Sequence, residues 1–172
     1  MGESGIFDLE NCQDNERKLL DLLGTYDCKI DSKGRLLVPK GLKEQLKDVI
    51  HEGFVVNRDL YEKSLVIYPW SVWKKNNSRL NKLNTFIKKN RDFIRQFTAN
   101  AVRMDLDGQG RVLVNASLLN YAGIKKDLKL IANGDQIEVW SARAYEKALK
   151  ADLNTEALAE EIFGAGNFDD SE

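Results

Sequence analysis

The sequence predicts an α+β fold in which one unit, a β-hairpin followed by a helix, occurs twice along the chain. Three observations support this prediction. Residues 27–39 and 103–115 match each other, with five of thirteen aligned pairs identical. Apolar and polar residues alternate through both segments, as they do in half-buried strands. A chain of 172 residues, 42% hydrophobic and 31% charged, has the length and composition of one ordinary domain or two small ones.

The first unit covers residues 22–73 and opens with a predicted β-hairpin. Tyr26, Cys28 and Ile30 alternate with polar residues, which is the period of a half-buried strand. The SKG that follows has turn chemistry, because Gly34 takes a positive φ at no steric cost. The remaining predicted elements are a returning strand at 35–38, a helix entered at Pro39, strands at 54–57 and 64–69, and a helix that begins near Pro69.

The second unit covers residues 102–150 and repeats this order. Val102, Met104 and Leu106 alternate with polar residues, and Gly110 again allows a positive φ in the turn. The remaining predicted elements are a strand at 111–114, a helix capped by Asn115 and ended by Gly123, strands at 127–133 and 136–140 around an Asn-Gly-Asp turn, and a helix that begins at Ser141.

Residues 74–101 form a predicted basic helical connection between the two units. They contain eight bases against one acid, together with an apolar seam at helical spacing. A seam with a basic back is typical of a helix that packs on its neighbours, and DNA contact through the back stays open. The sequence also leaves open whether the segment is one helix or two with a break near Asn84. The seam consists of Leu80, Leu83, Ile87, Ile94 and Phe97.

Charge is segregated along the chain. Residues 19–150 carry 24 bases against 15 acids, so the overall net charge of −1 hides a basic body between acidic ends. Such a body suits a polyanion partner, although a solvated lysine-rich surface explains it equally well. Residues 1–21 are expected to be a disordered extension, and residues 151–172 an acidic tail that either competes with DNA or keeps the protein soluble. Since neither a presequence nor a membrane-spanning run is found, we expect a cytoplasmic location and no membrane partner.

The composition gives little support to enzyme chemistry. His51 is the single histidine and lies at a helix exit typical of a solvated side chain, while Cys12 and Cys28 are too few for a disulfide framework. Gly108 and Gly110 lie between two strands, whereas a phosphate-binding loop leads into a helix. We therefore expect no catalytic residue, no metal, no cofactor and no small-molecule substrate.

The tips of the two predicted hairpins hold the candidate binding residues. In the first tip, Asp31 and Arg35 lie four residues apart, so the carboxylate either accepts backbone N–H groups or holds the guanidinium by a bidentate pair. An arginine oriented at a protruding tip, beside Lys29 and Lys33, suits contacts to phosphates or to a guanine edge, and a two-stranded ribbon enters the major groove. The corresponding candidates in the second tip are Arg103, Asp107 and Arg111.

The repeated motif resembles that of a known family. YDCKIDSKGRLLVP, DGQGRVLV, the basic NKLNTFIKKNRDFIRQF between them and LNYAGIKK are together similar to MraZ proteins, the two-copy members of the AbrB-like swapped-hairpin DNA-binding superfamily. The resemblance covers residues 22–149. It implies that the two copies pair about a pseudo-twofold axis into one interleaved, double-split β-barrel with flanking helices.

The resemblance also implies a function. Members of the family are nucleoid-associated transcriptional regulators, usually repressors, of the bacterial division and cell-wall gene cluster, and they bind tandem promoter repeats as homo-oligomeric rings. Carried over to this chain, the family's motif pairs are Asp31 with Arg35 and Asp107 with Arg111. Arg35 is expected to matter most, since ring packing could turn Arg111 towards a neighbouring subunit. The alternative is an oligomeric interaction scaffold or antitoxin-like partner whose hairpins bind protein.

Overall fold

The computed structural model describes residues 20–151 and 153–166, so most of the expected extension at 1–21 lies outside the described residues. The first copy contains β1 (Leu22–Lys29), β2 (Arg35–Leu37), α1 (Lys40–Gln45), the 3-10 helix η1 (Ile50–Glu52), β3 (Phe54–Arg58) and β4 (Leu65–Pro69). The connection holds α2 (Trp70–Asn81) and α3 (Lys88–Thr98). The second copy contains β5 (Val102–Met104), β6 (Arg111–Leu113), α4 (Ala116–Tyr121), β7 (Asp127–Gly134), β8 (Gln136–Ser141) and α5 (Ala142–Leu149), and α6 (Thr155–Gly164) follows.

The helix starts are confirmed where the sequence predicts them. Pro39 and Pro69 directly precede α1 and α2. The side chains of Asn115 and Ser141 accept hydrogen bonds from the backbone N–H groups of Ser117 and Ala144, at 2.7 and 3.1 Å, and so cap α4 and α5.

The strands of the two copies pair with each other throughout. β1 pairs with β7, β2 with β6, β3 with β5 and β4 with β8, all antiparallel. Within a copy, β3 pairs with β4 and β7 with β8. The result is a six-stranded sheet in the order β1-β7-β8-β4-β3-β5 and a two-stranded ribbon of β2 and β6. The α+β class is thus confirmed.

The prediction that each copy opens with a hairpin of its own two strands is wrong beyond the turn. In the first copy a single bridge joins Ile30 to Leu36, after which β1 continues along β7 and β2 along β6. The reason is that apolar alternation specifies which side chains face inward but not which strand lies alongside. Both copies therefore contribute to one apolar core, in which Leu36 and Val112 from the two-stranded ribbon are buried.

The connection consists of two helices, with the break around Asn84 that the sequence had left open. Trp73 on α2 stacks against Phe97 on α3 at a centroid distance of 5.9 Å, and the buried Asn57 donates a hydrogen bond from Nδ2 to the carbonyl of Phe97 at 2.8 Å. The expected seam packs only in part, because α3 contains no fully buried residue.

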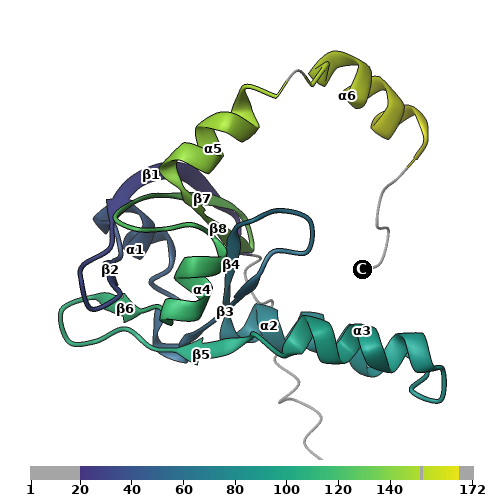
Figure 1. Ribbon diagram of the computed structural model, residues 1–172, viewed down its shortest axis with the longest axis horizontal. Coiled ribbons are helices and arrows are strands. Elements are labelled where there is room, and N and C mark those ends of the chain that lie inside the picture. The colour runs from purple at the N-terminus through teal and green to yellow at the C-terminus, as the bar shows by residue number, and fades with distance from the viewer. Residues whose placement is uncertain (1–19, 152, 167–172) are drawn as a thin grey trace, which may run out of the picture.

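Figure 1 shows how these parts lie in space. The turns that lead into β2 and β6 protrude together on one side, while α2 and α3 extend from the lower right of the body and α5 and α6 rise from its top towards the upper right. None of the helices within the described residues is long and apolar enough to cross a membrane.

Candidate nucleic-acid interface

The first candidate tip is a turn built around one carboxylate. Oδ1 of Asp31 accepts hydrogen bonds from the backbone N–H groups of Lys33 and Arg35, each at 2.9 Å, and Oδ2 accepts one from Nε of Arg35 at 2.7 Å. The backbone N–H of Asp31 donates to the carbonyl of Arg35 at 3.0 Å and closes the turn. Of the two arrangements left open by the sequence, the carboxylate therefore caps the backbone, and it holds the guanidinium through Nε alone.

The second tip repeats this geometry. Asp107 accepts from the backbone N–H groups of Gln109 and Arg111 at 2.9 and 3.0 Å, and from Nε of Arg111 at 2.8 Å. Because Nε is the atom engaged in both copies, both terminal guanidinium nitrogens of Arg35 and of Arg111 are left without a hydrogen bond to the rest of the described chain. These four nitrogens are the donors that a phosphate or a guanine edge would require.

Each tip is completed by the other copy. The backbone N–H of Val114 donates to the carbonyl of Gly34 at 2.8 Å, and that of Val38 donates to the carbonyl of Gly110 at 3.1 Å. Both glycines have a positive φ, +79° and +75°, as the turn chemistry predicts. The two tips are therefore the two ends of one short ribbon.

The outer face of this ribbon brings both arginines together with two leucines. Arg35 lies opposite Leu113 and Leu37 opposite Arg111, so that the arginines form a diagonal pair, for which a Cβ separation of about 7–8 Å is typical. Leu37 and Leu113 are 58% and 61% exposed. These leucines are not among the predicted site residues. Their alternation with the buried Leu36 and Val112 nevertheless predicts that they face outward.

The carboxylates at the tips remain ionised at neutral pH. The pKa of Asp31 is lowered from its ordinary value, chiefly by the backbone hydrogen bond from Arg35, and the pKa of Asp107 is lowered for the same reason by Arg111. Each arginine is thus partly neutralised by its own aspartate. A further base lies beside each turn: Lys33 is exposed within the first, and the ammonium of Lys43 lies over the second. Both tips are therefore attractive to a polyanion.

The other predicted site residues lie at varied distances from the tips. Lys33 is exposed within the first turn, and Lys29 ends β1, with its ammonium 4.0 Å from the carboxylate of Asp127. Arg103 belongs to β5 at the edge of the six-stranded sheet, where its guanidinium lies 4.2 Å from the ring centroid of Trp70. The structure therefore brings Arg103 to neither turn.

Lys43 on α1 is a basic residue near the second tip that the sequence analysis did not predict. A Cβ added to Gly110 would lie 2.7 Å from its Nζ, so the ammonium lies over the second turn. Nothing in the local sequence pattern connects a residue of α1 with a turn 67 positions later, because the contact depends on strand pairing between the copies.

Over residues 20–151 and 153–166, no group of three His, Cys, Asp or Glu side chains could hold a metal ion. Cys28 is half-buried, and its burial, followed by the nearby charge of Asp27, raises the pKa of its thiol to about 11. This thiol is therefore protonated at neutral pH and a weak nucleophile.

A family model described as "MraZ protein, putative antitoxin-like" matches residues 22–96 and 97–165, one match for each copy. The chain belongs to the MraZ family. The transcriptional regulator MraZ of Christiangramia forsetii is 41% identical over 152 residues, which cover 88% of this chain and 98% of that protein. The transcriptional regulator MraZ of Flavobacterium psychrophilum is 43% identical over 150 residues, covering 87% and 96%.

A more distant relative and a solved structure are less similar in sequence to this MraZ chain. The transcriptional regulator MraZ of Clostridium tetani is 33% identical over 144 residues, covering 84% of this chain and 98% of that protein. The solution structure of PHS018 from Pyrococcus horikoshii is 16% identical and covers 69% of this chain and 88% of its own, but its TM-score of 0.31 is too low to support any conclusion about the fold.

Proposed function

We propose that the chain is a sequence-specific, DNA-binding transcriptional regulator that contacts promoter DNA through the outer face of the β2–β6 ribbon. The observation that carries this proposal is the repeated Asp–Arg geometry, which fixes Nε of Arg35 and Arg111 and leaves their terminal nitrogens unbonded on side chains that are 33% and 25% exposed. A two-stranded ribbon of this kind fits the major groove, where a bidentate arginine discriminates guanine by about 1–3 kcal/mol. The relatives' names describe a non-enzymatic role, which agrees with it.

The regulator is proposed to work as a homo-oligomeric ring in the cytoplasm, associated with the nucleoid, and to repress the division and cell-wall gene cluster. One ribbon makes few contacts, but a ring that engages tandem promoter repeats at once multiplies weak sites through effective concentration. The pairing of every strand of one copy with a strand of the other supports a pseudo-twofold, interleaved β-barrel as the body of each subunit.

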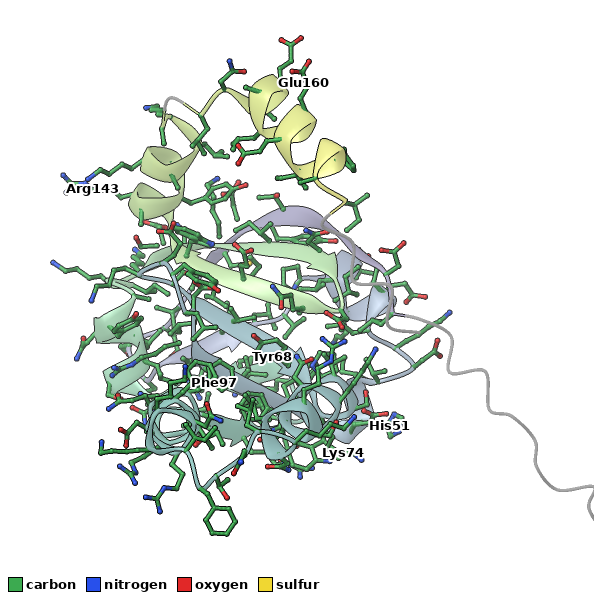
Figure 2. The ribbon with its side chains drawn as sticks, turned by 90° about the vertical axis from the view of Figure 1, so that its right-hand side faces the viewer. His51, Tyr68, Lys74, Phe97, Arg143 and Glu160 are labelled. Carbon is green, nitrogen blue, oxygen red and sulfur yellow. The ribbon has the colours of Figure 1, made fainter. Side chains whose placement is uncertain are left out.

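A gel-shift titration of the full chain on its own upstream promoter region tests the proposal. Arg35→Ala is expected to abolish the specific shift while the protein keeps its fold and its oligomeric mass. Arg143→Ala is the matched control, since Arg143 is an exposed arginine on α5, away from the ribbon (Figure 2). Wild-type affinity of the Arg35 variant would refute the ribbon as the DNA interface. If the wild-type protein, freed of nucleic acid, retained neither promoter DNA nor heparin, the antitoxin-like scaffold would replace the regulator.

A further inference from the structure

α6 is an acidic amphipathic helix whose apolar side faces outward. Leu158 and Ile162 lie one turn apart on the same side and are 39% and 47% exposed. Glu161 borders this apolar stripe, Glu156 and Glu160 lie on the other side of the helix, and α6 contains no base. A helix with this pattern usually covers its apolar stripe with another element.

α3 has the opposite charge and an exposed aromatic side chain. Phe93 on α3 and Phe86 in the turn before it are 42% and 97% exposed. Lys89 lies one helical turn before Phe93 on the same side of α3, whereas Arg91 faces the other side. α3 carries four bases against one acid, Asp92. Because that acid pairs with Lys88 and Arg95, it leaves Lys89 and Arg91 without an ionic partner among the described residues.

We propose that α6 of one copy docks on α3 of a neighbouring copy. Leu158 and Ile162 would then cover Phe93, and Glu161 would pair with Lys89. Both terms favour the same occupant, since an apolar stripe alone would accept many partners whereas the charge pattern selects an acidic helix. The inference rests on the homo-oligomer proposed above and identifies the surfaces that would join its subunits.

The positions of the two helices favour docking between chains over docking within one chain. Figure 1 shows α6 above and α3 below on the same side of the body, and in Figure 2 Glu160 on α6 lies far from Phe97 on α3 and Lys74 on α2. The linker between α5 and α6, residues 150–154, spans at most about 18 Å when fully extended. A contact between two different surfaces is head-to-tail, and it closes into a ring when the rotation per subunit permits.

A second basic surface is the competing site for α6. It is a depression lined by Lys63, Lys125, Lys126, Arg143 and Lys147. Its aliphatic lining residues are alanines, which offer little apolar area to Leu158 and Ile162. This surface matches the charge of α6 but not its apolar stripe, and so provides a control.

Sedimentation velocity of the full chain without DNA tests the docking. Lys89→Glu, and separately Glu161→Lys, are each expected to shift the protein from the wild-type oligomer to smaller species. Combining the two substitutions restores opposite charges and is expected to regain the wild-type mass. Lys125→Glu, a reversal of equal size on the competing surface, is expected to leave the mass unchanged.

Each other outcome overturns the docking. These are unchanged mass in either one-sided variant, no recovery in the combined variant, or loss of mass in the control. Far-UV circular dichroism of the same samples excludes unfolding as the source of a smaller species. A wild-type chain that stays monomeric at all concentrations would remove both the docking and the ring. DNA binding through Arg35 is scored separately by gel shift, so that failure of the docking and failure of the regulator proposal are distinguishable.

Discussion

The two glycines at the tips provide a matched pair of substitutions that tests the ribbon geometry. Gly34 and Gly110 occupy equivalent positions with nearly equal backbone angles, φ +79° and +75°. Their surroundings differ. A Cβ on Gly34 would lie 2.8 Å from the carbonyl oxygen of Val114, whereas a Cβ on Gly110 would lie 2.7 Å from Nζ of Lys43. Gly34→Ala thus meets backbone, and Gly110→Ala meets the far end of a flexible side chain.

The expected cost follows from these contacts. An alanine held at positive φ costs about 1–2 kcal/mol, offset by roughly 0.5 kcal/mol because alanine restricts the unfolded chain. Gly110→Ala should therefore lower the free energy of unfolding by about 1 kcal/mol, since the Lys43 ammonium moves away. Gly34→Ala adds roughly 1 kcal/mol more, because the β6 backbone must shift and the Val114-to-Gly34 hydrogen bond weakens. The total loss in free energy of unfolding for Gly34→Ala is then about 2 kcal/mol.

Urea unfolding of both variants and the wild type, at one protein concentration, measures the difference. The expected order of stability is wild type, Gly110→Ala, Gly34→Ala, with the Gly34 variant also the weaker in a promoter gel shift. Equal losses in the two variants would show that the approach of Gly34 to Val114 does not limit the turn. Full stability in both would refute the positive φ itself.

Four further predictions concern the same surfaces. The Asp31 carboxyl should titrate below its ordinary pKa of 3.8 in a carbon-13 NMR titration, because the folded turn stabilises the charged form; this stabilisation is present above that pH and is lost as the pH falls through the lowered folded value. On non-specific DNA, to which Arg35→Ala still binds, the slope of log affinity against log salt should become shallower by about 0.9 for each phosphate contact that the substitution removes. Leu37→Ala with Leu113→Ala should change the free energy of unfolding by less than about 0.5 kcal/mol. Replacing operator thymines by uracils should weaken binding of the wild type, because the thymine methyl groups are lost, but should not weaken binding of this double variant. Asn57→Ala should cost about 1–3 kcal/mol in urea unfolding, since the carbonyl that ties α3 to β3 loses its buried donor.

The elements themselves could be predicted because their signals are local. The alternation through Tyr26, Cys28 and Ile30, the proline and asparagine at helix starts and the glycines of the turns each act over a few residues. The Asp–Arg pairs were predictable for the same reason, since a carboxylate four residues before an arginine closes its own turn. What these signals lack is the identity of the neighbouring strand. The pairing of β2 with β6 depends on residues 76 positions apart and on a core shared by both copies.

The same limit explains why the composition of the site was only partly predicted. Arg103 occupies a polar position in the alternation of its strand. Because β5 pairs with β3, however, its guanidinium packs on Trp70 and donates to the carbonyl of Glu52 at 3.1 Å, and so does not reach the turn. Lys43 approaches the second turn because of strand pairing between the copies, which no short stretch of sequence specifies. Residues that reach the site through a partner strand or helix require the topology, whereas those within the turn do not.

The exchange of hydrogen bonds between the tips makes the ribbon, rather than the single tip, the unit of the proposed DNA interface. The carbonyl of each tip glycine accepts from the opposite copy, so neither turn has its observed form unless both copies are folded together. Arg35 and Arg111 then share one face at a fixed diagonal spacing, and a DNA contact made by one constrains where the other can reach. A duplex bound to this face would therefore meet two coupled arginines per subunit, with Lys33 beside one and Lys43 beside the other.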